Sequence, residues 1–556
     1  HDYDVLVVGG GVVGCAIARE LSRFKVSAAV LEKEMDVGLG TSCRNSGVLH
    51  AGFNYAPGSL RAVLDVKGNA MMDDLCRDLK VKIKRIGKLT VALDEEDEGT
   101  LQRLLEQGRA NGVPGLEIIG KERMQAIQPG VEGYMALYSP TSSIISPYAL
   151  TIGLAENALA NGVNFHLGQQ VVSVTPLAGK GREVGTKSGE RFACAVLVNA
   201  SGLFAADVCR MAGITEYAIY PCRGEYYVLD KRLDGTLRTL IYPAPKKNAP
   251  GLGIHLTPTV DGNILIGPSA EYLNDPEDHS CTYDVMAELR REGKELLGEI
   301  RMTDYIRNFA GIRPKQTPPE VGGNKDFVIE DRKDAKGFVN LVGIESPGLT
   351  SAPAIAEMVR GMVEKHIPLL PDPAFNPVRP GSPFFFSELP ADERAAMIAE
   401  NPNYGEIICR CEKITKQEIL DAIKNPLGAR TLVSIKYRAR ASMGRCQGGF
   451  CVPRITRILR DEFGWNPEDF LKRGGSSPMT RFLLGGFVMV GALMFLGCPL
   501  RMMLRIAGGD LNAVVGLLGF IGGIGMGVIF LKRGFSLKRT YKLPVADGIW
   551  LPAIQT

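Results

Sequence analysis

Residues 4–20 read DVLVVGGGVVGCAIARE, and this stretch decides the fold of the chain. Val5 to Val8 form an apolar, mostly β-branched run, and apolar side chains recur at helical spacing after the glycines. The pattern predicts a buried strand that turns directly into a helix. In such a turn Gly9 permits the tight bend, Gly11 lets the backbone approach a pyrophosphate, and Gly14 lets the helix pack on the strand. The free N–H groups of the first helical turn then face the phosphates.

The next segments indicate which nucleotide is bound. Residues 28–31 are apolar and end on Glu32, eighteen residues after Gly14, where an acid can accept hydrogen bonds from ribose hydroxyls. Residues 40–52, GTSCRNSGVLHAG, are too rich in glycine and small polar residues for a helix interior. We expect a loop that wraps closely around a large planar cofactor. This favours FAD over NAD, whose nicotinamide must bind and dissociate in each turnover.

Residues 45–62 read NSGVLHAGFNYAPGSLRA. With this segment the chain resembles the D-amino-acid-oxidase-like superfamily of FAD enzymes, and most closely its L-2-hydroxyglutarate dehydrogenase and oxidase branch. The segments PCRGEYY, IYPAP and GIHLTPTVDGNILIGPSAEY look like the substrate-domain sheet of that branch. The alternation of short strands and turns from Tyr220 to Gly267 also predicts an antiparallel sheet. Between Leu60 and Gly120, in contrast, the pattern is helical.

The resemblance implies further contacts with FAD. The apolar strand 195–199 would bring Ala200 and Gly202 near the pyrophosphate, and the GIRP segment at 311–314 would lie at the flavin's reactive face. A helix start between Gly343 and Gly348 could stabilise the negative charge that develops near flavin N1 on reduction. The expected FAD-binding residues are Gly9, Gly11, Gly14, Glu32, Thr41, Ser42, Ser46, Gly47, Ala200, Gly202, Gly311, Gly343, Gly348 and Leu349.

Four of the twelve cysteines cluster in the sequence. Cys409 and Cys411 form a C-x-C pair, and Cys446 and Cys451 form a C-x4-C pair. Four thiolates can close a tetrahedral zinc site or hold a 2Fe-2S cluster. C-x-C is not the usual zinc-knuckle spacing, and the block resembles the bacterioferritin-associated-ferredoxin-like domain, a small helical 2Fe-2S module. The nearby arginines either offset the charge of the cluster or form a solvated basic face; they are Arg410, Arg438, Arg440 and Arg445.

The other eight cysteines are scattered, as expected of buried thiols in a reducing cytosol. The formal net charge of the chain is +4. From Lys472 onward ten Lys or Arg residues face two acids, so the first 471 residues carry −4. The basic excess therefore belongs to the tail and argues for membrane flanks and against a nucleic-acid partner.

Two stretches of the tail, 482–500 and 511–531, each hold about 20 mostly apolar residues, enough to cross a bilayer. Small residues repeat on one face of the second, at Gly519, Gly523 and Gly527, which suits close helix packing in lipid. The basic flanks place both ends on the cytoplasmic side. Residues 495–520 resemble part of the YeeE/YedE family of sulfur or selenium compound transporters, but they cover only about two of its helices. We interpret the tail as a partial module, a fusion or an artefact of gene prediction.

Two classes of function fit these features. In the first, a flavin dehydrogenase removes a hydride from a small 2-hydroxy acid such as L-2-hydroxyglutarate, with glycerol 3-phosphate as the competing substrate. Electrons would leave through the 2Fe-2S cluster to a quinone or a redox protein. In the second, a sulfur or selenium transport or relay protein would work through Cys498, with the flavoprotein as an accessory. The larger share of the chain favours the enzyme. A one-electron outlet beside the flavin favours a dehydrogenase over an oxidase.

The reaction requires a base for the hydroxyl proton and a group that binds the substrate anion. His50 and His255 lie in segments expected at the flavin and the pocket, and histidine titrates near neutrality. Arg313 can hold a carboxylate bidentately. The expected catalytic residues are thus His50, His255 and Arg313, with Arg223 and Tyr242 as weaker candidates for the pocket wall.

The predicted fold is α/β, with a Rossmann-like FAD-binding domain, an inserted antiparallel-sheet substrate domain, a small helical iron–sulfur domain and a two-helix transmembrane tail. A length of 556 residues suits three or four units at about 150 residues each. We expect the catalytic part on the cytoplasmic side of a membrane, anchored by the C-terminal hairpin. The expected boundaries are an oxidoreductase at 1–370 (FAD-binding pieces at about 1–80, 145–218 and 308–370; substrate domain at about 81–144 and 219–307), a linker at 371–404, a 2Fe-2S domain at 405–465, a linker at 466–480 and the membrane hairpin at 481–556.

Overall fold

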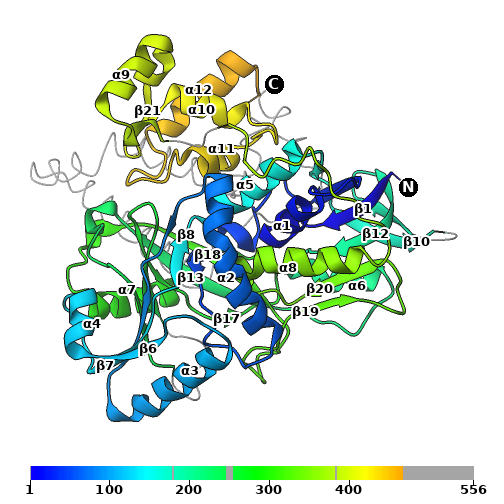
Figure 1. Cartoon of the computed structure of the whole chain (residues 1–556). Coiled ribbons are helices and arrows are strands. Elements are labelled where there is room, and N and C mark those ends of the chain that lie inside the picture. Colours follow the sequence, from blue (N-terminus) through cyan, green and yellow to red (C-terminus); the bar gives the residue numbers. More distant parts are fainter. Residues whose placement is uncertain (1, 178–180, 246–253, 382–384, 467–556) are drawn as a thin grey trace, which may run out of the picture. The chain divides into compact units, whose positions relative to one another are not determined.

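The computed structural model describes residues 2–177, 181–245, 254–381 and 385–466 (Figure 1). The chain divides into two units, one of His1–His279 with Glu288–Phe470 and the other of Ser280–Ala287 with Leu471–Thr556. Helix α7 (Tyr283–Leu296) begins in the second unit, and the other described elements belong to the first.

The first sheet is built around the opening strand of the sequence. β1 (Tyr3–Val8) lies between β12 (Arg191–Asn199) and β2 (Ala28–Glu32) and runs parallel to both. Five further strands complete the sheet: β9 (Asn164–Leu167), β10 (Val171–Pro176), β11 (Arg182–Thr186), β19 (Val328–Asp331) and β20 (Phe338–Val342). The predicted strand, glycine turn and helix are therefore confirmed.

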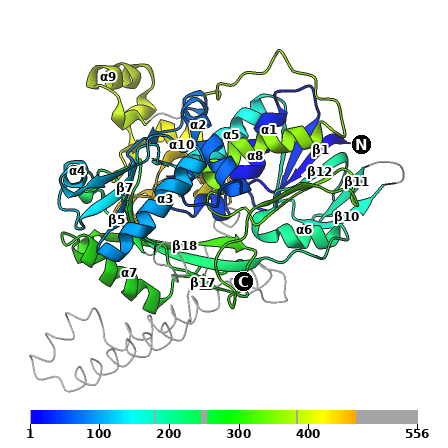
Figure 2. The same ribbon diagram turned by 60° about the horizontal axis from the view of Figure 1, so that its bottom comes forward.

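Strand β1 contributes to two cores, because successive side chains of a strand point to opposite faces. Leu6 and Val8 pack with residues of α6 (Ala205–Met211). Val5 and Val7 pack on the other face with four helices, α1 (Val12–Leu21), α2 (Leu60–Leu79), α5 (Pro147–Ala160) and α8 (Gly348–Val363). Figure 2 shows α1, α5 and α8 on one side of this sheet and α6 on the other.

The second sheet has nine strands and is largely antiparallel, as the alternation after Tyr220 predicts. In order they are β17 (Glu271–Tyr272), β13 (Tyr220–Leu229), β16 (Ile264–Gly267), β15 (His255–Pro258), β14 (Leu240–Pro243), β5 (Lys88–Ala92), β7 (Met135–Ser139) and β6 (Glu117–Gly120), with β18 (Tyr305–Lys315) on the other edge of β13. The β14–β5 pair is parallel. A small third sheet joins β3 (Val48–Leu49), β8 (Ser143–Ile145) and β4 (Ile83–Lys84).

The helical prediction for residues 60–120 is only partly right. Helices α2 and α3 (Glu98–Ala110) are present, and α4 (Lys121–Ile127) follows, but β4, β5 and β6 also fall in this region. All five residues of β5 are buried, including Lys88 and Thr90. A strand buried on both faces lacks the alternation that identifies a half-exposed strand in a sequence.

The cysteine-bearing region, residues 407–463, is small and mostly helical. A hairpin of β21 (Ile407–Cys409) and β22 (Ile414–Thr415) precedes α10 (Lys416–Ile423), α11 (Leu432–Ala439) and α12 (Cys451–Phe463), and α9 (Ala391–Glu400) lies before the hairpin. Its core holds Ile408, Ile419, Ile435, Ile455 and Leu459. Thr415 and Glu418 form a capping box at the start of α10, which fixes where this helix begins.

None of the helices that the structure describes is both long and apolar enough to cross a membrane. The two tail segments expected to do so, 482–500 and 511–531, lie outside the described residues, as does Cys498. The transmembrane hairpin and the transporter resemblance therefore stay predictions.

Candidate active site

The glycine turn after β1 is tightly closed. Gly9 has a φ of +109°, and a Cβ atom there would lie 2.5 Å from the carbonyl oxygen of Ala200. A Cβ at Gly14 would lie 1.9 Å from the carbonyl oxygen of Gly9. Only glycine fits these two positions. Gly11 precedes the first residue of α1 and has no side chain with which to cap it, so N–H groups of the first turn remain available to a phosphate.

Glu32 lies beside this turn at the end of β2. Its Oε2 accepts a hydrogen bond from the Gly10 N–H at 2.7 Å, and its Oε1 accepts one from the Glu34 N–H at 2.8 Å. Burial raises the pKa of Glu32, while these two N–H groups oppose the rise. An oriented carboxylate at the end of the second strand fits the ribose of a dinucleotide.

The loop of residues 41–47 is held between the start of α1 and strand β18. Ser42 Oγ accepts a hydrogen bond from the Val12 N–H at 2.9 Å, and the Thr41 hydroxyl donates to the Ile312 carbonyl at 2.7 Å. A Cβ at Gly311 would lie 1.8 Å from the Arg44 carbonyl oxygen. The loop backbone therefore lies directly against the GIRP segment. A planar cofactor bound here would be surrounded by the small residues of the loop and of this segment.

The structure brings the expected FAD-binding residues into one region. Gly9 meets Ala200, Gly10 meets Glu32 and Val12 meets Ser42, while the loop meets Gly311 and Ile312. The other expected residues lie at the ends of neighbouring elements. Gly202 opens a 3-10 turn after β12, Gly47 has a φ of +67° next to β8, and Ser46 faces Tyr226. Gly343 follows β20, and Gly348 and Leu349 begin α8. These residues fit FAD.

His50 is fixed by its backbone. Its N–H donates to Thr350 Oγ1 at 2.9 Å, and its carbonyl accepts from Asn69 Nδ2 at 2.6 Å. The imidazole Nε2 lies 3.3 Å from Ser346 Oγ. Burial, assisted by Lys88 and His255, lowers the pKa of His50 to about 3, so the imidazole is neutral at physiological pH. A neutral imidazole can accept a proton.

Lys88 is a buried cation in the same region. Its Nζ lies 3.7 Å from the centre of the Tyr242 ring and 5.2 Å from the centre of the Phe53 ring. The His255 ring stacks on Tyr242 with centroids 3.9 Å apart. Lys88 is only 2 % exposed, and burial lowers its pKa to about 7, although Asp65 opposes the shift. The site thus gathers His50, His255 and Lys88 within electrostatic reach of one another.

Asp65 on α2 is the acid facing this group. The residue is fully buried, and neither carboxylate oxygen accepts a regular hydrogen bond from the described residues. Burial raises the pKa of Asp65 well above its usual value, and the Thr350 hydroxyl and the Lys88 ammonium only partly offset this rise. A neutral Asp65 does not balance the charge of the Lys88 ammonium, which suits an anionic ligand.

Sequence reasoning did not identify Lys88 or Asp65. Lys88 stands in a short strand that also holds Thr90, and Asp65 in a helix with many polar residues, so neither position gives a sequence signal. A buried charge is recognised only once the surrounding elements are assembled.

Arg313 lies on β18 facing β13. Its NH2 donates to the Ser269 carbonyl at 2.9 Å, its NH1 lies 3.5 Å from Cys222 Sγ, and it lies beside the Tyr226 hydroxyl. Arg223, expected at the pocket wall, forms ion pairs with Glu225, Glu271 and Asp278. Three carboxylates therefore balance the Arg223 guanidinium, and its place in the pocket wall stays a prediction.

The four clustered cysteines meet as two pairs. The Cys451 thiol hydrogen-bonds to Cys409 and lowers its pKa to about 6, and Cys411 hydrogen-bonds to Cys446. The backbone N–H of Phe450 lowers the pKa of Cys446. No three His, Cys, Asp or Glu side chains within the described ranges surround a single metal position. Two thiol pairs that face backbone N–H donors fit a cluster with two irons, in which each iron takes two thiolates.

Comparison with known proteins agrees with this geometry. The family model described as DAO, FAD dependent oxidoreductase, matches residues 4–362, and the BFD-like [2Fe-2S] binding domain matches residues 407–461. A glycerol 3-phosphate dehydrogenase of Caloramator mitchellensis is 42% identical over 468 residues, which cover 83% of this chain and 95% of that protein. The mitochondrial L-2-hydroxyglutarate dehydrogenase of Homo sapiens is 30% identical over 416 residues, which cover 66% and 90%.

A solved structure has a similar fold. The dithionite-reduced L-alpha-glycerophosphate oxidase from Mycoplasma pneumoniae with FAD bound has a TM-score of 0.63 and 28% sequence identity, covering 68% of this chain and 98% of that one. The chain therefore belongs to the DAO family of FAD dependent oxidoreductases, acts on CH–OH donors, and uses FAD together with a 2Fe-2S cluster in a BFD-like domain.

Proposed function

We propose that this dehydrogenase oxidises glycerol 3-phosphate at its secondary hydroxyl and yields dihydroxyacetone phosphate. The observation that carries the proposal is the 42% identity to a glycerol 3-phosphate dehydrogenase over a stretch long enough to include both the flavin and the cluster regions. The L-2-hydroxyglutarate relative is less similar and covers less of the chain. The preference for a 2-hydroxy acid, drawn from short segments of sequence, therefore becomes the second candidate.

The basic groups of the site support an anionic substrate. Lys88, His50 and His255 gather at one end of the region, and the acid among them, Asp65, is held toward its neutral form by burial. A phosphate dianion would replace the missing negative charge and be bound by the Lys88 ammonium. Arg313 offers a second cation from β18, another strand of the same sheet.

The proton of the substrate hydroxyl goes to His50 in this proposal. Ser346 and Thr350 hold the His50 side chain and backbone in place. The charge of the bound anion would offset Lys88 and raise the pKa of His50, so the imidazole becomes a better base only when substrate is present. FAD, when bound, accepts the hydride from the substrate carbon.

The test is anaerobic incubation of the yellow protein with each candidate substrate. Glycerol 3-phosphate should bleach the flavin and form dihydroxyacetone phosphate in a one-to-one ratio. L-2-hydroxyglutarate at the same concentration should bleach the flavin at least about a hundredfold more slowly. Bleaching by L-2-hydroxyglutarate alone would reverse the assignment.

We also propose that the catalytic part works on the cytoplasmic side of a membrane and is held there by the C-terminal hairpin. The support is the apolar composition of 482–500 and 511–531 and their basic flanks. Deletion of residues 477–556 should release an active yellow protein from the membrane fraction of expressing cells. Full-length protein that is recovered without detergent in the soluble fraction would contradict the proposal.

A further inference from the structure

Two arginines at the end of α11 bind the cluster domain to the flavin region. The solvated face that the sequence left open is wrong for Arg438 and Arg440, whereas an offset of the cluster's charge stays a prediction. Their side chains are 5% and 8% exposed. Arg438 forms a two-pronged ion pair with Asp36, which lies shortly after the ribose carboxylate Glu32 in the sequence. The other two arginines lie elsewhere: Arg410 over the Phe450 ring and Arg445 beside Asp230.

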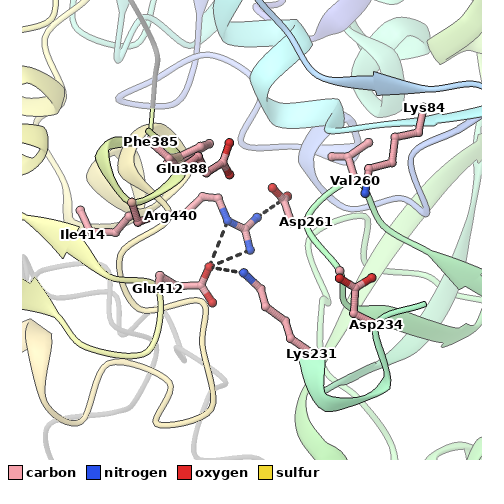
Figure 3. A pocket seen from close by; sticks show the side chains of 12 residues that line it. Lys84, Lys231, Asp234, Val260, Asp261, Phe385, Glu388, Glu412, Ile414 and Arg440 are labelled. Carbon is pink, nitrogen blue, oxygen red and sulfur yellow. Dashed lines mark hydrogen bonds and ion pairs between the residues drawn. The ribbon is translucent and has the colours of Figure 1, made fainter. Parts of the chain in front are cut away.

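Arg440 connects three parts of the molecule (Figure 3). Its Nε and NH2 donate to Glu412 Oε2 at 3.3 and 3.2 Å. Its NH1 donates to Tyr148 Oη at 2.7 Å and forms an ion pair with Asp261. Glu412 directly follows the cluster residue Cys411, Tyr148 lies in α5 of the flavin domain, and Asp261 lies in the turn between β15 and β16. One guanidinium therefore contacts the residue after Cys411, helix α5 and the turn between β15 and β16.

The backbone of Arg440 is adapted to this position. The residue has a φ of +57°, in the left-handed region that a non-glycine residue rarely adopts, directly after the last residue of α11. Lys231 adds a second contact, since its Nζ lies 2.7 Å from Glu412 Oε2. The Tyr148 ring also stacks on Tyr437 with centroids 5.1 Å apart.

Arg440 and Glu412 border a cavity of about 230 Å³. Apolar packing therefore does not fill this part of the boundary between the cluster domain and the flavin domain. Figure 3 shows charged side chains from both sides around it, with Arg440, Glu412 and Glu388 opposite Lys231, Asp234 and Asp261. Buried ion pairs add little net stability, but they penalise every orientation in which a charge loses its partner. The ion pairs therefore add to the Tyr148–Tyr437 stack in fixing the orientation at this boundary.

We propose that Arg440, together with Arg438, is a positioning residue that fixes the cluster domain against the flavin domain, so that electrons pass between two centres held at a constant separation within one chain. Oxidation of one CH–OH group to a carbonyl releases two electrons and two protons. The electrons leave one at a time through the cluster to an external acceptor of the quinone class, and the protons go to solvent. The proposal rests on the two cofactors and not on the identity of the substrate.

The sharpest variant is Asp261→Asn, because it removes the carboxylate that Arg440 contacts on the flavin side without changing the cluster domain. Arg440→Gln and Arg440→Lys form a series on the other side, and Arg191→Gln is the control, since Arg191 is 73% exposed and pairs with nearby Glu183. The flavin is reduced by photochemical reduction in the absence of substrate, and the appearance of the reduced cluster is followed by visible absorption and paramagnetic resonance. This readout does not depend on which substrate the enzyme takes.

Asp261→Asn and Arg440→Gln should slow electron arrival at the cluster at least about tenfold, because each removes the buried ion pair that joins Arg440 to the turn between β15 and β16. Arg440→Lys should be intermediate, and Arg191→Gln unchanged. The cluster spectrum and the flavin content of Asp261→Asn should equal those of the parent. Electron arrival at the parental rate in Asp261→Asn would overturn the proposal, including in the case where Arg440→Gln loses its cluster.

Discussion

At the scale of single residues, the proposed substrate site depends on cations that are buried inside the protein. Lys88 is buried beside two aromatic rings, facing the Asp65 carboxyl that burial holds toward its neutral form, and the pKa of Lys88 falls to about 7. A lysine with a lowered pKa is charged below that value and neutral above it. The ability of the free enzyme to bind an anion should therefore weaken as the pH rises through about 7.

Replacement of Lys88 by Met tests this role. KM for glycerol 3-phosphate should rise about tenfold or more, because a charge-assisted contact with the phosphate is lost. The decline of kcat/KM above pH 7 should also disappear, since this profile reports groups of the free enzyme. Steady-state kinetics from pH 6 to 9 would check both effects. An unchanged KM with an unchanged alkaline decline would show that Lys88 does not bind the substrate.

Lys88→Met should also change how the thermal stability of the protein depends on pH. The unfolded lysine binds a proton up to about pH 10, whereas the folded one releases it near pH 7, so the wild type gains stability as the pH rises between these values. Lys88→Met removes this dependence. Its advantage in melting temperature over the wild type should be largest below pH 7 and shrink toward pH 10. A melting temperature that falls equally at all pH values would indicate a packing defect.

Arg313→Lys concerns the second cation. A lysine ammonium cannot reproduce the planar fork of a guanidinium, which here donates to the Ser269 carbonyl and lies beside Tyr226. KM should rise about tenfold while the flavin stays bound, because Arg313 is proposed to bind the substrate anion and not FAD. Kinetics and the absorbance of bound flavin measure the two quantities separately. Parental kinetics would remove Arg313 from the site.

At the scale of elements, the fold rests on close approaches of backbone that side chains would block. The clearest case outside the first turn is Gly311, where a Cβ would lie 1.8 Å from the Arg44 carbonyl oxygen. The contact joins β18 to the loop of residues 41–47. Gly361 in α8 is the opposite case, because a Cβ there would meet nothing within 4 Å.

Gly311→Ala should therefore push the loop away from β18 and weaken FAD binding about tenfold or more. Gly361→Ala should leave FAD binding unchanged and stabilise the helix by about 0.5–1 kcal/mol. Flavin content after dialysis and thermal unfolding would report the two effects. Full retention of flavin by Gly311→Ala would mean that the loop is not part of the cofactor site.

Sequence predicts elements whose signals are local, and contacts between elements require the structure. The strand, glycine turn and helix at residues 4–20 and the C-x-C and C-x4-C pairs are local patterns, and the structure bears them out. Strand β5 gives no such pattern, because all five of its residues are buried. The partners of Arg438 and Arg440 are 402 and 179 residues away, so a short basic segment cannot show whether it faces solvent or a distant carboxylate.

At the scale of the whole molecule, a flavin region and an iron–sulfur region share one chain. Replacing Cys446 and Cys451 by Ser should abolish the visible and paramagnetic signals of the cluster, since serine is a poor substitute for thiolate ligands. Bleaching of the flavin by substrate should stay within about twofold of the parent, because the cysteines lie on separate elements from the flavin site. Turnover with a quinone-type acceptor should fall. Full quinone turnover without the cluster would show that electrons leave the flavin by another route.

The central claim is that the paired flavin and cluster serve the oxidation of glycerol 3-phosphate. The most direct measurement is anaerobic stopped-flow absorption of the full-length protein mixed with glycerol 3-phosphate or with L-2-hydroxyglutarate at equal concentrations. With glycerol 3-phosphate we expect the flavin to bleach and the cluster to be reduced afterwards. With L-2-hydroxyglutarate bleaching should be at least about a hundredfold slower, because a site built for one anionic group rejects a poorly matched analogue. Faster bleaching by L-2-hydroxyglutarate would contradict the proposed function.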